Sequence, residues 1–307
     1  MTPGAMNDDA RSARVAYLLL TLTAAFWAGN TVIGRAVVGE LPPLGFAFWR
    51  SFGAFLILAP IGLPRMWRAR AEIARHWKIL TLLGVLGMTG FAVFSFVALH
   101  STGAVNATLI QGSQPVIVLI ASWMIFRLAI TGRQIAGIVV ALTGLVAIVT
   151  RGELGALTGL GLNAGDFVFW LGVLCHGLFT ALLPLRPKSL DLVCFLTTAF
   201  LIGALTTLPF HIGEMVVSEV MPLTWTALGA VLFVAVFPSV LAQLFWVESI
   251  RRIGPATAGY FVYLTPVFGT LAGIALLGEA FAWYHGAGIV LILGGVWLAT
   301  GARRRAG

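Results

Sequence analysis

Polar and aromatic side chains recur at helical spacing inside long apolar stretches of this sequence. Residues at i, i+3, i+4 and i+7 share one face of a helix, so Trp27 lies beside Asn30, and Gln111 beside Gln114. In an apolar environment such side chains are costly unless they face a cavity or a partner helix. We therefore predict a binding cavity lined by Trp27, Asn30, Met88, Phe91, Ser95, Gln111, Gln114, Trp170, His176, Ser239, Gln243, Trp246, Tyr260 and Tyr263.

Some of these side chains have a second interpretation that the sequence leaves open. Gln111, Gln114 and Gln243 could instead hydrogen-bond neighbouring helices to one another. Trp170 and Trp246 are equally compatible with cavity lining and with anchoring near a membrane surface.

The charged and titratable candidates are few. His176 lies deep in its apolar segment and is either a structural histidine or a titrating group. For Arg50 we expect a structural role, with the side chain snorkelling or pairing with a helix C-terminus, rather than the bidentate binding of a carboxylate. No carboxylate is expected at mid-depth, so the cavity should be uncharged and suit a neutral zwitterion with an apolar or aromatic side chain.

Two prolines stand inside apolar segments at matching places, Pro115 and Pro266. A proline removes a backbone donor and clashes with the carbonyl four residues earlier, so it bends or breaks a helix. We interpret both as hinges whose freed carbonyls could accept a substrate ammonium, with a static kink as the alternative.

The composition requires an apolar solvent around most of the chain. The 307 residues are 59% hydrophobic and only 10% charged, with a mean hydropathy of +0.99, whereas soluble domains carry about 25% charged residues. Runs of about 20 apolar residues span a bilayer as helices, and period-two alternation typical of a membrane β-barrel is absent. The predicted spans are 15–37, 43–61, 78–99, 103–126, 132–150, 165–184, 191–210, 222–247, 255–278 and 283–301.

The net charge of +8 does not indicate nucleic-acid binding, because the basic residues are distributed according to the order of the predicted spans. Sixteen of the 19 Lys and Arg residues fall in the two terminal segments and in every second loop. This is the positive-inside pattern, which places both termini in the cytoplasm and requires an even number of spans.

The second part of the chain repeats the first. Residues 103–149 and 254–300 align without gaps, with 12 of 47 positions identical, including Gly137 with Gly288 and Gly144 with Gly295. Five spans per copy make the second copy enter the membrane from the opposite side, an arrangement that transporters use to build a site at the midplane. We predict a cytoplasmic tail at 1–14, repeats at 15–150 and 165–301, and a basic tail at 302–307.

The motifs "FAFWRSFGAFLIL" (46–58), "IRRIGPATAGYFVYLTPVFGTLAGIALLGEAF" (250–281) and "GAGIVLILGGVWL" (286–298) resemble the drug/metabolite transporter superfamily, in its EamA-type branch. The resemblance covers essentially the whole chain. It implies ten helices and the export of small metabolites, chiefly amino acids, across a bacterial cytoplasmic membrane. The aromatic-rich helices look most similar to the exporters of amino acids, aromatic ones included.

These observations together predict a multi-pass exporter of the bacterial inner membrane that works by alternating access, uncoupled or by exchange. Its partners would be a small solute and the lipid bilayer, with no nucleic acid and no cofactor; a monomer is compatible with the sequence. Proton-coupled efflux through His176 is the alternative mechanism. An intramembrane enzyme and a non-transporting receptor or scaffold are the alternative classes, but the five histidines show no metal-ligand spacing and no soluble output domain is expected.

Overall fold

The computed structural model describes residues 3–37, 40–98, 100–157, 161, 163–217, 220–277 and 280–301. These residues contain helices and no β-strand, and ten helical segments are long and apolar enough to cross a membrane. The predicted class, an all-α membrane protein with ten spanning helices, is confirmed. The predicted basic tail, 302–307, lies outside the described residues.

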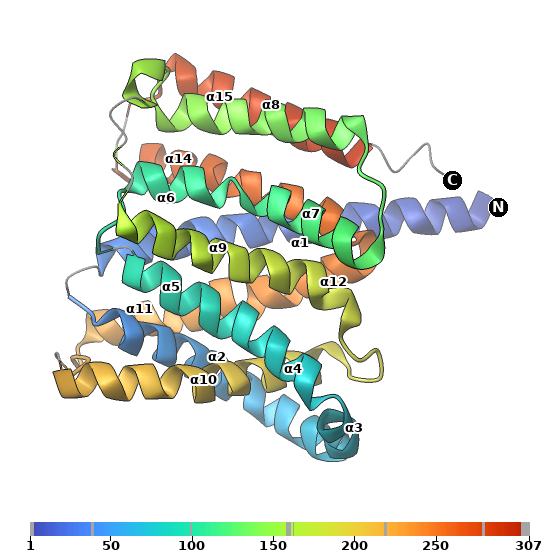
Figure 1. Ribbon diagram of the computed structural model, residues 1–307, viewed down its shortest axis with the longest axis vertical. Coiled ribbons are helices and arrows are strands. Elements are labelled where there is room, and N and C mark those ends of the chain that lie inside the picture. Colours follow the sequence, from blue (N-terminus) through green and yellow to red (C-terminus); the bar gives the residue numbers. More distant parts are fainter. Residues whose placement is uncertain are drawn as a thin grey trace.

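The spans lie side by side along a common direction (Figure 1). The uninterrupted ones are α1 (Pro3–Ala36), α2 (Pro43–Arg68), α8 (Gly132–Val149), α9 (Ala164–Leu182), α10 (Leu192–Val217) and α15 (Trp283–Thr300). The others are α4–η1–α5 (Trp77–Gly84, Val85–Gly90, Phe91–Ala98), α6–α7 (Ala104–Gln111, Gln114–Phe126), α11–η4–α12 (Trp225–Val234, Ala235–Leu241, Ala242–Ile253) and α13–η5–α14 (Pro255–Gly259, Tyr260–Tyr263, Leu264–Leu277). Three short helices, α3 (Arg70–Arg75), η2 (Leu154–Leu157) and η3 (Leu183–Leu185), complete the described structure.

The first helix extends beyond the bundle. It begins at Pro3, so residues 3–14 of the predicted tail are helical and continue into the first span (Figure 1). The sequence has no proline between Pro3 and Pro42, so nothing local ends the helix where the apolar stretch begins.

The interruptions occur at corresponding places in the two copies. The segments η1 and η4 are both π-helical and lie 151 residues apart to within one residue. The break between α6 and α7 at Gly112 likewise corresponds to the end of the 3₁₀ segment η5 at Tyr263. The hydroxyl of Tyr263 donates to the carbonyl of Gly112 at 3.0 Å, so these two breaks contact each other near mid-depth.

Corresponding helices also pair across the molecule. A Cβ on Gly137 would lie 2.6 Å from the carbonyl oxygen of Gly295, and a Cβ on Gly144 would lie 2.6 Å from that of Gly288. Because 137 faces 295 while 144 faces 288, α8 and α15 run antiparallel. These four glycines let the two backbones touch, and the pair forms the outermost layer of the bundle (Figure 1).

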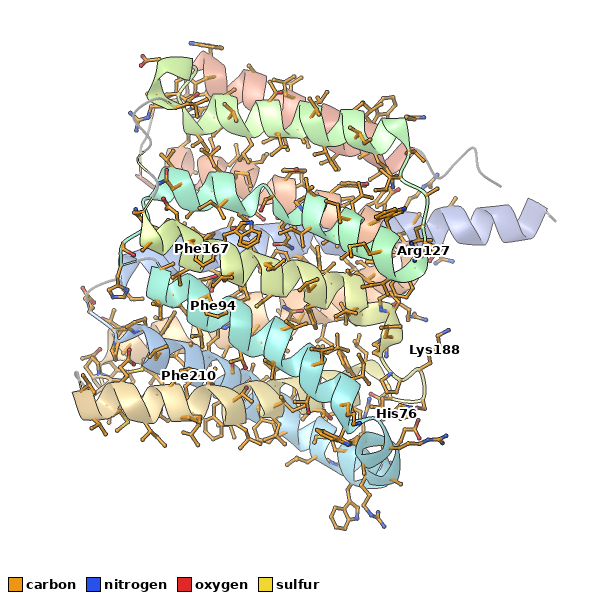
Figure 2. All side chains as sticks on the ribbon, in the orientation of Figure 1. His76, Phe94, Arg127, Phe167, Lys188 and Phe210 are labelled. Atoms are coloured by element: carbon orange, nitrogen blue, oxygen red, sulfur yellow. The ribbon has the colours of Figure 1, made fainter. Side chains whose placement is uncertain are left out.

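One end of the bundle carries most of the basic residues and is closed. Arg127 and Lys188 lie at this end together with His76 (Figure 2), and we call it the basic end. Beneath it, a buried cluster of Phe179, Leu183, Phe195, Trp246, Ile250, Ile253 and Phe261 fills the space between the helices. The ring of Tyr17 stacks on Phe261 with centroids 5.3 Å apart, which seals α1 against η5.

Ion pairs connect side chains at the surface of the basic end. Arg65 of α2 contacts Asp191 at 2.8 Å, and Glu248 accepts hydrogen bonds from both Arg251 and Arg252 at 2.7 Å. Burial acts to raise the pKa of Asp191, but the backbone N–H of Cys194 and the guanidinium of Arg65 outweigh it, so this pKa lies below its ordinary value.

Candidate functional site

A cavity of about 690 Å³ lies between the two copies. Its lining reaches from His176 and Tyr263 at mid-depth to Thr31 and Gly273, near the ends of α1 and α14 that lie opposite the basic end. We call that opposite end, where α8 finishes at Val149, the far end. None of the seven residues named beneath the basic end is among the described lining residues, whereas residues near the far end are, so the cavity extends toward the far end.

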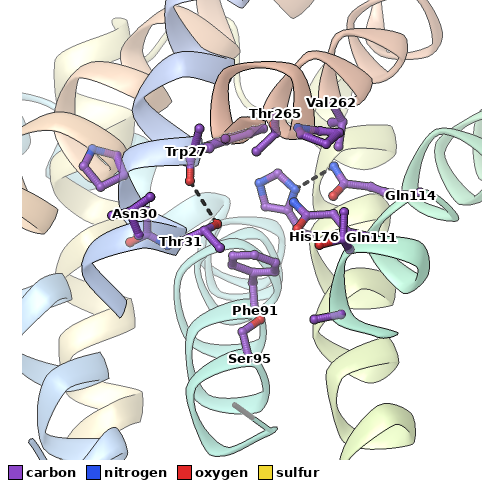
Figure 3. Close-up of a pocket in the computed structure, with 18 of the residues that line it drawn as sticks. Trp27, Asn30, Thr31, Phe91, Ser95, Gln111, Gln114, His176, Val262 and Thr265 are labelled. Atoms are coloured by element: carbon purple, nitrogen blue, oxygen red, sulfur yellow. Dashed lines mark hydrogen bonds between the residues drawn. The ribbon is translucent and has the colours of Figure 1, made fainter. Parts of the chain in front are cut away.

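The cavity wall is largely aromatic around His176. The indole of Trp27 lies 4.8 Å from that of Trp246 and 5.2 Å from the imidazole of His176, measured between ring centroids. Phe91 lies 5.2 Å from the same imidazole on its other side. Trp246 is held from behind, since its Nε1 donates to Thr180 Oγ1 at 3.2 Å. Trp27, Phe91 and His176 line the inner end of the cavity (Figure 3), with their rings inclined at 83° between Trp27 and His176 and at 51° between Phe91 and His176.

The imidazole of His176 is oriented by Gln114. The Gln114 amide nitrogen lies 2.9 Å from His176 Nδ1 and donates to it (Figure 3). The proton of a neutral His176 is then on Nε2. His176 therefore presents an N–H donor rather than a lone pair to its surroundings.

Among the described lining residues, Arg50 carries the one permanently charged side chain. It lines the cavity wall although only 5% of the residue is exposed, and its Nη1 donates to Ser239 Oγ at 3.2 Å. The hydroxyl of Ser239 in turn donates to the carbonyl of Val234 at 2.7 Å, five residues earlier at the end of α11. The extra residue per turn of η4 thus orients Ser239 to accept from Arg50.

Helix α2 is fixed at both ends, which determines where Arg50 lies. At the far end the Glu214 carboxylate accepts the backbone N–H groups of Leu44 and Gly45 at 3.0 and 2.6 Å. Nearer the basic end Gly62 approaches Thr197 so closely that no Cβ would fit. Our expectations of a snorkelling Arg50 and an uncharged cavity are wrong, because α2 faces η4 at this level and directs the guanidinium inward.

Several polar atoms of the lining have no hydrogen-bond partner within the described protein. They are Asn30 Oδ1, Ser95 Oγ, Gln243 Oε1 and Thr265 Oγ1, together with Arg50 Nε. Buried polar groups nearly always find partners. The residues that line the cavity thus carry hydrogen-bonding capacity that the described protein does not use, with neutral oxygens from α1, α5, α12 and α14 and a cationic donor from α2.

The structure brings many of the predicted binding residues to the cavity. Those that line it are Trp27, Asn30, Phe91, Ser95, Gln111, Gln114, His176, Gln243 and Tyr263. The predicted hinge Pro266 also lines it, whereas Pro115 is buried in the first turn of α7 beyond the break at Gly112. Sequence reasoning missed Arg50, Thr31, Thr265 and Phe169 as lining residues.

Five predicted residues are not part of the lining. Met88 lies in η1 and faces Gly203 of α10, and Ser239 lies behind Arg50 in η4. Both belong to π-helical segments, whose extra residue per turn rotates the faces expected from α-helical spacing. Trp246 packs behind Trp27 as a second layer.

The remaining two predicted residues, Trp170 and Tyr260, lie outside the cavity. Trp170 is 37% exposed and stacks on Phe167, which is 61% exposed. Tyr260 is buried with Leu119, Ile138 and Ala299, where η5 meets α8 and α15. The packing of η5 against α8 and α15 places the Tyr260 side chain outside the cavity, and the spacing of residues along the segment does not reveal that packing.

The described residues hold no cluster of three or more His, Cys, Asp or Glu side chains suited to a metal ion.

The EamA-like transporter family matches the chain twice, over residues 14–150 and 163–301. The chain belongs to this family.

The EamA-type assignment agrees with individual relatives over almost the full length. The chain is 26% identical to the "Uncharacterized transporter YyaM" of Bacillus subtilis (strain 168), over 94% of both chains. It is 24% identical to the "Probable amino-acid metabolite efflux pump" of Salmonella typhimurium, over 91% of this chain and 93% of that one. A crystal structure with 19% identity superposes with a TM-score of 0.73 over 97% of this chain and 99% of the other, which shows the same fold.

This EamA-type protein is therefore a membrane transporter, and its ten spans and bacterial relatives identify it as a multi-pass protein of the bacterial inner membrane. Its relatives are named as transporters, in agreement with the expectation of a protein that is not an enzyme.

Proposed function

We propose that this EamA-type transporter exports small neutral metabolites, amino acids with apolar or aromatic side chains among them. The observation that carries the proposal is the composition of the cavity, in which aromatic rings adjoin unpartnered amide and hydroxyl groups. A volume of about 690 Å³ falls within the range of small-molecule sites and accommodates an amino acid. The name of the Salmonella relative, an amino-acid metabolite efflux pump, is in keeping with this substrate class.

The proposed mechanism is alternating access between two inverted copies. The antiparallel pairing of α8 with α15, which correspond in sequence, supports opposite orientations of the copies. With the basic end in the cytoplasm, as the charge distribution predicts, a cavity open at the far end corresponds to an outward-facing state. The breaks at Gly112 and η5, which precede the proposed hinges Pro115 and Pro266, are suitable places for the bundle to flex.

We further propose that transport is uncoupled or proceeds by exchange. Proton-coupled carriers commonly use an intramembrane carboxylate, and no Asp or Glu is among the described lining residues. His176 is the remaining candidate for proton coupling, but it is enclosed by Trp27, Phe91, Phe179 and Trp246 and already accepts from Gln114.

Counterflow into proteoliposomes tests both parts of the proposal. Vesicles loaded with unlabelled threonine, methionine, phenylalanine or tryptophan should accumulate the same radiolabelled compound, and empty vesicles should not. If no compound in this panel exchanges, the amino-acid assignment is wrong. Stimulation by an imposed pH gradient that is lost in His176→Ala would instead establish proton coupling and contradict the uncoupled mechanism.

A further inference from the structure

Arg50 is a buried cation whose hydrogen-bonding capacity is mostly unused by the protein. A guanidinium carries five N–H donors; one bond from Nη1 reaches Ser239, and Nε is buried without a partner. Ser239 is neutral, and its own proton is committed to the carbonyl of Val234. It therefore orients Arg50 without neutralising it.

No acidic side chain of the described residues forms an ion pair with Arg50. The ion pairs among the described residues join Arg65 to Asp191, His76 to Glu72, and Arg251 and Arg252 to Glu248. All of them lie on helix ends or loops near the basic end. A charge removed from water without a counter-ion is strongly unfavourable, so buried charges in proteins are normally paired. The counter-charge of Arg50 is thus expected to come from the transported solute.

A carboxylate is the anion that best matches this position. The planar fork of a guanidinium binds a carboxylate through two parallel hydrogen bonds, and the carboxylate is present in every amino acid. The ammonium group of such a solute has no fixed negative charge to meet among the described lining residues. Only neutral acceptors, such as Asn30 Oδ1 and Gln243 Oε1, are available to it.

We propose that Arg50, positioned by Ser239, is the carboxylate-binding group of the cavity and that recognition depends more on the carboxylate than on the ammonium. This inference rests on the proposed function and deepens it, since it names the group of the solute that must be present. The cavity then accepts carboxylates with an apolar or aromatic side chain, and deaminated acids are included in that class.

Three compounds that share one side chain test the inference in counterflow of radiolabelled phenylalanine. Phenylalanine has both charged groups, phenylalaninamide lacks the carboxylate, and 3-phenylpropionate lacks the ammonium. Unlabelled 3-phenylpropionate should compete within about tenfold of phenylalanine, because it keeps the group that Arg50 binds. The amide should compete at least about 30-fold less well, the lower bound expected when a buried charge loses its partner.

Variants of α2 separate binding by Arg50 from general damage. Arg50→Gln should abolish the preference for acid over amide, whereas Arg50→Lys should reduce it, since an ammonium cannot reproduce the fork. Arg68→Gln removes an exposed cation from the same helix and should leave the preference unchanged. The preference is a ratio measured within one preparation, so it does not depend on the amount of folded protein.

Binding measured in detergent distinguishes failure of this inference from failure of the proposed function. If phenylalanine shows no counterflow, the amino-acid assignment fails, but thermal stabilisation of the protein by 3-phenylpropionate, absent in Arg50→Gln, would still support Arg50 as a carboxylate site. The inference is overturned if the amide competes or stabilises as well as the acid, or if Arg50→Gln retains the acid preference.

Discussion

The contact between α8 and α15 predicts opposite outcomes for the same substitution at adjacent residues of one helix. Gly295 and Gly294 of α15 are neighbours, but only Gly295 faces α8. A Cβ on Gly295 would lie 2.6 Å from both the backbone nitrogen of Ala141 and the carbonyl oxygen of Gly137. A Cβ on Gly294 would meet nothing within 4 Å.

The loss of stability expected for Gly295→Ala depends on which atoms must move to make room for the new Cβ. The atoms in the way are mainly backbone, so the overlap cannot be relieved by a side-chain rotation and the two helices have to separate by about 1 Å. A gap of that size forfeits a quarter to a half of the dispersion energy along the contact, and overpacking of this kind costs about 1–3 kcal/mol. Gly294→Ala removes a flexible glycine from a helix interior without a clash, which should stabilise the protein by about 0.5–1 kcal/mol.

The assay is chemical denaturation of the purified protein in detergent, followed by the helical signal in far-ultraviolet circular dichroism. We expect the midpoint of Gly295→Ala to fall below that of the wild type and the midpoint of Gly294→Ala to equal or exceed it. If Gly295→Ala is as stable as Gly294→Ala, the two helices do not pack through their glycines and the arrangement of this layer is incorrect.

Two further predictions concern the mid-depth contact and the basic end. Tyr263→Phe removes the hydrogen bond to the Gly112 carbonyl and should lower the free energy of unfolding by about 0.5–1.5 kcal/mol; an unchanged denaturation midpoint would mean that the two breaks are not joined there. Asp191 has a pKa below its ordinary value of 3.8, so its contribution to stability is present above that pH and is lost as the pH falls through the lower folded pKa. Because both partners are about half exposed, Asp191→Asn should cost no more than about 1 kcal/mol at pH 7 and should flatten the stability profile below pH 3.8, which thermal melts across pH would reveal.

The sequence was sufficient for the features that depend on composition and on local spacing. The ten spans follow from apolar length alone, and the correspondence of Gly137 with Gly288 and of Gly144 with Gly295 follows from the gapless alignment of the two copies. The aromatic and amide faces of α1 and α9 were also predictable, because those helices have regular α-helical geometry around Trp27 and His176.

The predictions of site residues failed where a helix departs from α-helical geometry, and where the packing of two helices determines the depth of a side chain. Met88 and Ser239 were assigned to the cavity by α-helical spacing, but π-helical segments turn them away from it. The depth of Arg50 depends on how α2 crosses η4 and on the anchoring of α2 by Glu214, and neither can be read from the residues near Arg50. An ionisable residue inside an apolar span is nevertheless a functional candidate by default, and this signal was available for Arg50.

Alternating access requires that one cavity be reached in turn from both faces of the membrane, and the accessibility of single thiols measures this. In a background with Cys175 and Cys194 replaced by alanine, single cysteines would be placed at Gln111, beside the mid-depth contact of Gly112, and at Thr270, nearer the far end. A membrane-impermeant methanethiosulfonate should modify Gln111→Cys from either face of oriented vesicles, and Thr270→Cys only from the far-end face. Modification of Gln111→Cys from the far-end face alone, at exhaustive reaction times and with solute present, would contradict alternating access.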